Sequence, residues 1–153
     1  TEDAPKVGET FNLKGVKSWE GLSEKAKVMM GTGVYETTIK LSKDDAKKQW
    51  TIDLGDVRES ARVYVNNKYI GCAWAVPYIL NCKDALNKGK NTIRIEVTNL
   101  PANRIAEMDR QGVKWRKMKD INVVDINYKK TTYENWTPVS SGLNSTVKLV
   151  EIK

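Results

Sequence analysis

Two segments in which every second side chain is apolar set the architecture that this chain can adopt. The segments cover residues 61–66 and 92–98, and their apolar members are Val63, Val65, Ile93, Ile95 and Val97. A period of two with a single apolar face is typical of a half-buried strand. Between them, Asn66 and Asn67 tolerate the left-handed backbone of a tight turn, and Gly71 lies in the returning strand. The sequence therefore predicts an antiparallel β scaffold.

Other segments extend this pattern in both directions. Further strands are predicted over residues 35–41, 50–54 and 147–152, with an edge strand near Phe11 and Leu13 and a bulged strand within residues 114–130. Short helical turns are expected within residues 19–27 and 103–110, the second ended by Gly112. Short strands, few helices and 153 residues predict one all-β domain over residues 1–153, an antiparallel β-sandwich.

An ordered series of motifs gives this region a family resemblance. The motifs are Leu54-Gly55-Asp56-Val57, Ala61-Arg62-Val63-Tyr64-Val65-Asn66, Gly71, Trp74, Pro77-Tyr78, Gly89-x-Asn91 and Asn103-Arg104-Ile105. Together they resemble the jelly-roll, galactose-binding-like accessory domain of glycoside hydrolases, as in family 2 enzymes and the large α-L-rhamnosidases. The similarity covers about residues 13–149. It departs after Leu143, where Asn144-Ser145-Thr146 replaces the usual continuation with Gly-Pro.

The resemblance implies a non-catalytic, carbohydrate-binding accessory domain of a glycoside hydrolase that acts on polysaccharide. Its implied partners are a poly- or oligosaccharide, neutral or acidic, and the catalytic domain of the same parent chain. It also implies a periplasmic or extracellular location. Because Thr1 is not a natural start, we expect the chain to be excised from that larger protein. The alternative is a purely structural module that packs on the catalytic domain and binds no glycan itself.

The composition argues against an enzyme in this chain alone. Because the chain has no histidine, it cannot form a Ser-His-Asp triad or a Cys-His dyad, and no pair of cysteines has the spacing of zinc ligands. We expect no metal and no cofactor. Paired carboxylates could in principle hydrolyse glycosides, but Asp53 and Asp56 are interpreted as turn caps. Glu107 and Asp109 are interpreted as surface partners of nearby arginines. An independent hydrolase or an adhesion module remains a third hypothesis.

The charge distribution limits the kinds of molecule that this chain is expected to bind. The net charge of +7 comes from interleaved charges whose densest stretch is residues 110–119, with no nucleic-acid-binding motif. We therefore expect a solvated surface or contact with an acidic glycan, and no nucleic acid. No apolar run is long enough to span a membrane. Cys72 and Cys82 are either two small buried residues or a disulfide.

The aromatic residues supply the candidate binding site. Five tryptophans and six tyrosines accompany one phenylalanine, and sugar sites pair aromatic platforms with polar donors. We expect Trp50 in the core and Trp19 as a packed plug. The candidate carbohydrate-binding residues are Trp74, Tyr78, Arg104, Trp115 and Trp136, with Tyr133 as a weaker one. The alternative for the tryptophans is a lid folded over the sandwich's end. For Asn103-Arg104 it is a structural clamp or an interdomain contact.

Overall fold

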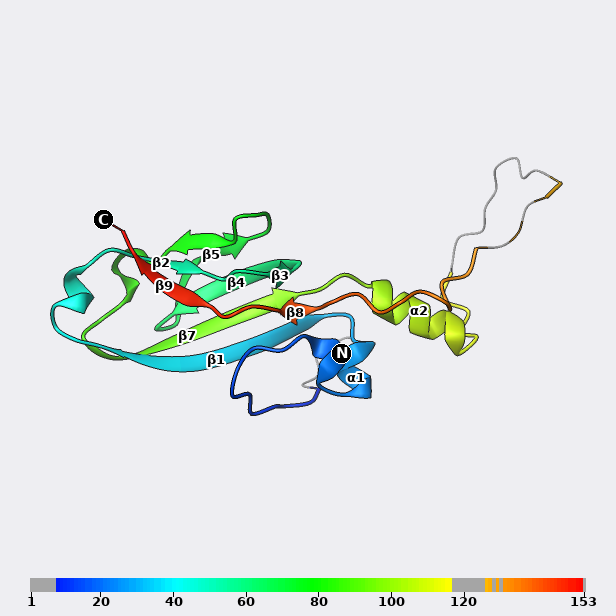
Figure 1. Ribbon diagram of the computed structural model, residues 1–153, viewed down its shortest axis with the longest axis horizontal. Helices are drawn as coiled ribbons and strands as arrows, with labels where there is room; N and C mark the ends of the chain where they lie inside the picture. Colours follow the sequence, from blue (N-terminus) through cyan, green and yellow to red (C-terminus); the bar gives the residue numbers. More distant parts are fainter. Residues whose placement is uncertain (1–7, 117–125, 128, 130, 153) are drawn as a thin grey trace, which may run out of the picture.

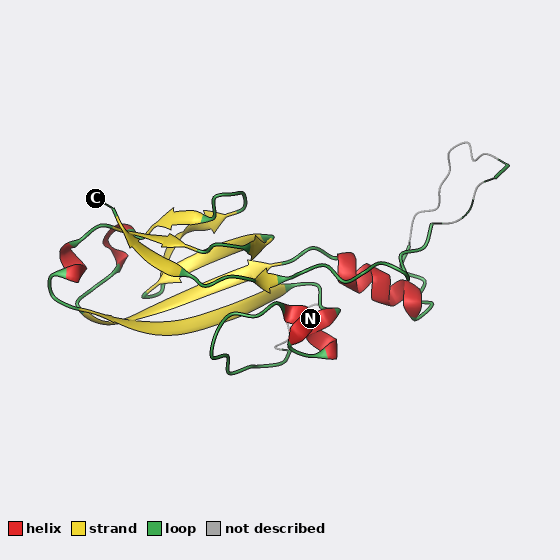
Figure 2. Ribbon diagram, in the orientation of Figure 1, coloured by secondary structure: helices red, strands yellow, loops and turns green. Residues whose placement is uncertain are grey.

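Antiparallel sheets dominate the molecule. The computed structural model describes residues 8–116, 126–127, 129 and 131–152. In this part of the chain the strands are β1 (Thr32–Leu41), β2 (Trp50–Asp53), β3 (Val57–Arg58), β4 (Ser60–Val65), β5 (Lys68–Ala73), β6 (Ile79–Asn81), β7 (Gly89–Thr98), β8 (Gly142–Leu143) and β9 (Lys148–Glu151). Figures 1 and 2 show these strands layered against one another, with only short helices at the margins. The predicted all-β sandwich is confirmed.

The strands pair in three groups. One sheet has the order β1-β7-β4-β5, a second has the order β6-β2-β9, and β3 pairs with β8. All these pairs are antiparallel. The strand predicted over residues 35–41 is confirmed as the longer β1, and the final strand is confirmed as β9.

Alternation along the strands builds the core, as the sequence predicts. Val63 of β4 lies opposite Ile95 of β7, and both are buried. Ile52 of β2 in the second sheet, and Leu54 just after that strand, belong to the same buried cluster. Full burial of such a side chain contributes about 1.5–3 kcal/mol, so the two apolar faces hold the sheets together.

The predicted turn joins β4 to β5. Asn66 and Asn67 both have positive φ, at 51° and 64°, which is the backbone of a type I′ hairpin turn. The amide of Asn66 also donates to the side-chain oxygen of Asn91 at 2.8 Å. Asn91 is fully buried, so this turn is anchored to the core rather than free in solvent.

The helices are short. They are η1 (Trp19–Gly21), α1 (Glu24–Lys27), η2 (Asp45–Lys47), η3 (Lys83–Ala85) and α2 (Ala102–Arg110). The hydroxyl of Ser23 caps α1 by accepting from the backbone N–H of Ala26 at 3.0 Å. Gly112, with φ at 65°, follows α2 as predicted. Figure 1 shows α2 beyond the end of the sandwich, with α1 at the same end. In the described residues no helix is long and apolar enough to cross a membrane.

Trp19 is a packed plug, as expected. Its side chain is 4% exposed, and its indole N–H donates to the Tyr35 hydroxyl at 2.7 Å. The same hydroxyl accepts from the backbone N–H of Leu143 at 3.0 Å. A Cβ on Gly142, whose φ is 85°, would lie 2.2 Å from the Trp19 indole nitrogen. The opening and closing segments of the domain therefore meet at this indole.

Some expectations are wrong or only partly met. Phe11 and Leu13 form no strand and are exposed, because no neighbouring strand pairs with that segment in the described residues. Trp50 is half-buried against the core rather than inside it. Most of the expected bulged strand within residues 114–130 lies outside the described residues.

The two cysteines differ. Both are free thiols, and Cys82 is buried while Cys72 is exposed. The interpretation as two small buried residues is therefore confirmed for Cys82 and wrong for Cys72. The register explains the difference. Cys72 pairs with Arg62, whose side chain alternates with the buried Ala61 and Val63, so Cys72 lies on the outer face of the sheet.

Candidate carbohydrate-binding site

Three aromatic rings meet beside α2. The ring of Tyr133 lies 4.6 Å from that of Trp136 and 6.4 Å from that of Trp115, measured between centroids, with tilts of 58° and 31°. We call Trp115, Tyr133 and Trp136 the aromatic cluster. Separations and tilts of this kind are favourable for interacting rings. Two of the predicted site residues and the weaker candidate Tyr133 are thus brought together by the fold.

A single carboxylate from α2 positions the cluster. Asp109, in the last turn of the helix, accepts from the indole N–H of Trp115 at 2.6 Å and from the backbone N–H of Tyr133 at 2.8 Å. The guanidinium of Arg110 donates to the carbonyl of Glu134 at 3.0 Å. Segments separated by more than a dozen residues are therefore tied to the same helix end.

A guanidinium completes the cluster. Arg116 lies 5.1 Å from the ring of Trp115 and 5.3 Å from that of Tyr133, close enough for a cation–π contact. It also donates to the carbonyl of Thr131 at 2.6 Å. Trp136 is 52% exposed, whereas Trp115, Tyr133 and Arg116 are half-buried. The arrangement offers an open aromatic face next to fixed N–H donors.

The acidic residues around α2 divide into two roles. Glu107 forms an ion pair with Arg110 at 2.9 Å, as expected of a surface pair. Hydrogen bonds from Arg110 and then Gln111 hold the pKa of Glu107 below its ordinary value. Asp109, which was also interpreted as a surface partner of an arginine, holds Trp115 and Tyr133 as well, because the loops after α2 turn back toward its last turn.

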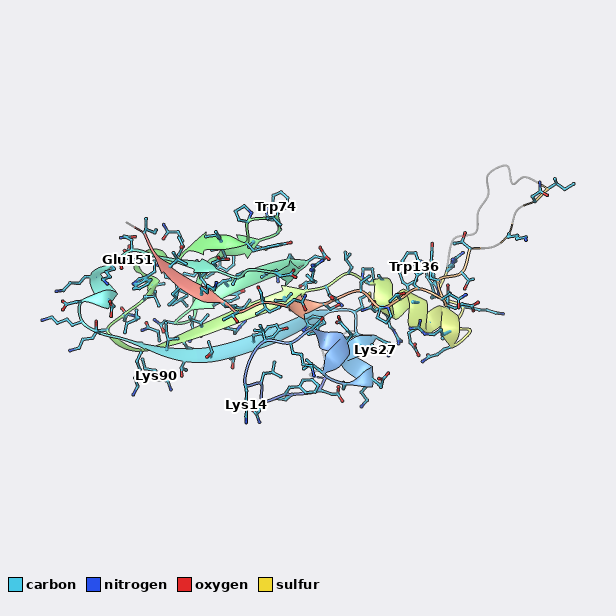
Figure 3. The ribbon with its side chains drawn as sticks, viewed as in Figure 1. Lys14, Lys27, Trp74, Lys90, Trp136 and Glu151 are labelled. Carbon is cyan, nitrogen blue, oxygen red and sulfur yellow. The ribbon has the colours of Figure 1, made fainter. Side chains whose placement is uncertain are left out.

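Trp74 and Tyr78 lie elsewhere. Trp74 is 77% exposed in the loop after β5, and Figure 3 shows it well separated from Trp136. Tyr78 is half-buried against the core, and its backbone carbonyl accepts from the N–H of Leu54 at 2.9 Å. These two predicted residues therefore belong to a different surface from the aromatic cluster.

Asn103 and Arg104 have different surroundings in the structure. The side chain of Asn103 is buried and both donates to and accepts from the backbone of Val139, each at 2.8 Å. Asn103 is thus a structural clamp, one of the alternatives raised for the pair. Arg104 is half-buried and lines a cleft between α1 and α2. We call this the α1–α2 cleft; its lining residues are Lys25, Val28, Met29, Met30 and Arg104.

The other predicted turn residues are accounted for. Asp53 accepts from the backbone N–H of Gly55 at 2.9 Å, which confirms it as a turn cap. Asp56 instead pairs with Arg58 at 2.6 Å. Within the described residues, no group of three carboxylate, thiol or imidazole side chains is placed to hold a metal ion.

Sequence reasoning missed Arg116 and Asp109 as parts of the site. The signal for Arg116 was its position next to Trp115, inside the densest basic stretch. No local signal pointed to Asp109, since its partners Trp115 and Tyr133 lie 6 and 24 residues away.

Comparison with known proteins gives the chain its relatives. A protein of Formosa agariphila that is provisionally named a beta-glucuronidase is 30% identical, over 88% of this chain and 13% of that protein. The structure of a rhamnosidase from Novosphingobium sp. PP1Y matches with a TM-score of 0.70 and 28% identity, over 88% of this chain and 12% of that one. A β-D-glucuronidase from Dictyoglomus thermophilum shares the fold, with a TM-score of 0.53, 17% identity and coverage of 63% of this chain and 17% of that one.

These matches agree with the architecture described above. The chain spans only about an eighth of the length of the first two relatives. The model of the glycosyl hydrolase 2 galactose-binding domain-like family matches residues 22–142, which include β1 to β7 and α2. The chain therefore belongs to the glycosyl hydrolase 2 galactose-binding domain-like family.

Proposed function

We propose that this chain is a non-catalytic carbohydrate-binding accessory domain of a glycoside hydrolase that degrades polysaccharide outside the cytoplasm. The aromatic cluster is its sugar contact. The observation that carries this proposal is the pair of Tyr133 and Trp136, whose rings lie 4.6 Å apart while half of Trp136 remains open to solvent. A ring that is held by a neighbour and still exposed has the form of a binding platform.

The chemistry of the cluster matches that of a sugar. The apolar C–H face of a pyranose stacks on an indole, and its hydroxyl groups accept hydrogen bonds from N–H donors. Trp136 supplies the indole face, and Arg116 supplies a nearby guanidinium that is already oriented by Thr131. Because Asp109 fixes Trp115 and the backbone of Tyr133, little ordering entropy remains to be lost on binding.

The names of the relatives support the proposal that the larger parent protein is a glycoside hydrolase. They are a rhamnosidase and a protein provisionally named a beta-glucuronidase, and this chain matches only a small part of each. In such a parent, the accessory domain holds a polysaccharide close to a catalytic domain. A second binding contact in the same molecule raises the effective concentration of substrate at the active site.

A second function, that of a structural module, has its own support. Exposed apolar side chains gather on the loop after β5 and the start of β6. There Trp74 is 77% exposed, Val76 is 83% exposed, and Ile79 follows close by. Exposed apolar residues of this kind mark an interaction surface. This surface is separate from the aromatic cluster, so the chain can pack on a catalytic domain through one and bind sugar through the other.

The test is a calorimetric titration of this chain against neutral and acidic oligosaccharides from plant polysaccharides. The unsubstituted chain is expected to release heat on binding. In Trp136→Ala and Trp115→Ala the affinity is expected to fall about five- to tenfold, because stacking on one ring contributes about 1–1.5 kcal/mol. If the folded chain gives no binding heat with any oligosaccharide of the panel, the carbohydrate proposal is overturned in favour of the structural module.

A further inference from the structure

The α1–α2 cleft combines an apolar lining with two cations. Its volume is about 340 Å³, and Val28, Met29 and Met30 line it together with Lys25 and Arg104. Lys25 comes from the last turn of α1, and Arg104 comes from the first turn of α2. Figure 1 shows these two helices at the same end of the molecule.

The two cations have no direct ion-pair partner within the described part of the chain. Neither Lys25 nor Arg104 makes a side-chain hydrogen bond or ion pair there. Glu107 lies within the electrostatic reach of Arg104, and its oxygens are already bound by Arg110 at 2.9 Å and Gln111 at 2.6 Å.

Other nearby acids are also engaged. Glu24 of α1 pairs with Lys27 at 3.4 Å. Glu20 is bonded to the hydroxyl of Ser18, and the backbone N–H of Ser141 donates to it at 3.3 Å. The cleft therefore places two cations that have no direct ion-pair partner in the described residues beside an apolar surface.

Such a combination favours a ligand with an anionic group and an apolar face. A guanidinium gives paired N–H bonds to a planar carboxylate or to the oxygens of a sulfate, and a neighbouring ammonium adds a second charge. Methionine side chains adapt their shape to an irregular apolar surface, such as the C–H face of a sugar ring.

We propose that the α1–α2 cleft is a subsite for an acidic sugar, with Arg104 and Lys25 holding its carboxylate or sulfate ester. This proposal rests on the proposed function, since it names the class of carbohydrate that the domain takes. It assigns recognition of charge to the cleft and leaves stacking to the aromatic cluster. Because Asn103, next to Arg104, is clamped to the backbone of Val139, the start of α2 is fixed and presents Arg104 in a defined place.

The experiment uses matched pairs of oligosaccharides. One pair compares a uronic-acid-containing oligosaccharide with its carboxyl-reduced neutral form, and the other compares a sulfated oligosaccharide with its desulfated form. This chain without substitutions is expected to bind the acidic member of at least one pair about tenfold more tightly than the neutral member at low salt. The preference is expected to shrink as salt rises. The pair that shows it distinguishes a carboxylate from a sulfate ester as the group recognised.

Variants assign that preference to the cleft. Arg104→Gln and Lys25→Gln are expected to remove most of the preference for the acidic member. The matched control is Lys40→Gln, which removes one positive charge from the exposed outer face of β1 and is expected to keep the preference. Thermal unfolding of each variant checks that the fold is intact.

Each other outcome has a defined meaning. Equal affinity for both members of each pair would overturn the acidic subsite and leave the proposed function standing. A preference that survives in Arg104→Gln and in Lys25→Gln would also overturn it, because the charge would then be recognised elsewhere on the chain. Absence of binding to every member would overturn the proposed function together with this inference.

Discussion

Asp109 accepts the indole N–H of Trp115 at 2.6 Å with one carboxylate oxygen and the backbone N–H of Tyr133 at 2.8 Å with the other. One side chain of α2 thus fixes two members of the aromatic cluster. The geometry separates positioning from contact: Asp109 orders the rings, while the exposed face of Trp136 remains for a ligand.

Asp109→Asn is therefore expected to weaken glycan binding without unfolding the protein. An amide has a single oxygen, so one of the two N–H groups loses its acceptor and the cluster loosens. We expect affinity to fall about tenfold, and the near-ultraviolet circular dichroism of the aromatic residues to weaken. Asp44→Asn, at an exposed surface pair with Lys47, is the control. Wild-type affinity in Asp109→Asn would contradict the positioning role.

Tyr35→Phe tests the junction between the two ends of the domain. The lost hydroxyl leaves the Trp19 indole N–H and the Leu143 backbone N–H without their acceptor. Each unsatisfied buried donor costs about 1–3 kcal/mol, so the free energy of unfolding in urea is expected to drop by about 2 kcal/mol or more. Tyr69→Phe, at an exposed position of β5, is expected to change it little. Equal stability of the two variants would show that the junction does not stabilise the fold.

Asn91→Ala tests the buried amide behind the Asn66-Asn67 turn. The Asn91 side-chain oxygen accepts from the Asn66 amide at 2.8 Å and from the Asn87 backbone at 2.7 Å, and its amide donates to two backbone carbonyls. Because a buried side chain with four partners is removed, we expect a loss of about 3 kcal/mol in unfolding free energy. Asn12→Ala, in an exposed segment, is the comparison, and a similar small effect in both would contradict the prediction.

Cys82 gives a prediction about pH. Burial raises the pKa of its thiol from 9.0 to about 11. Between these values the folded protein keeps a proton that the unfolded chain releases, so stability falls as pH rises from about 9 to about 11. Cys82→Ala removes this contribution and is expected to lose less stability over the same interval, measured by urea unfolding at pH 8.5 and at pH 11. Parallel declines in the two proteins would contradict the assignment.

Local pattern predicted the scaffold well. The alternation of Val63, Val65 and Ile95 identified the buried faces, because a strand turns successive side chains to opposite sides. The Asn66-Asn67 pair predicted its turn because few residues tolerate two consecutive left-handed conformations. These inferences need only neighbours in the sequence.

The site could be predicted only in part. The aromatic type and the polar sequence neighbours of Trp115 and Trp136 indicate candidate binding residues. That both rings contact Tyr133 depends on the path of the intervening loop. The same holds for Arg104 and Lys25, which lie 79 residues apart and share a cleft. Trp74 has equally favourable local sequence yet lies on another surface. Contacts between distant segments follow from the packing of the sandwich, which periodicity does not describe.

The central claim is that the aromatic cluster contacts sugar. Its most direct test follows the indole N–H resonances of the five tryptophans by nuclear magnetic resonance while an oligosaccharide that binds the chain is added. Trp136→Ala and Trp74→Ala assign the two exposed indoles. We expect the signals of Trp115 and Trp136 to shift with glycan concentration, while those of Trp74 and the buried Trp19 stay in place. A shift confined to Trp74, with Trp115 and Trp136 unmoved, would contradict the account.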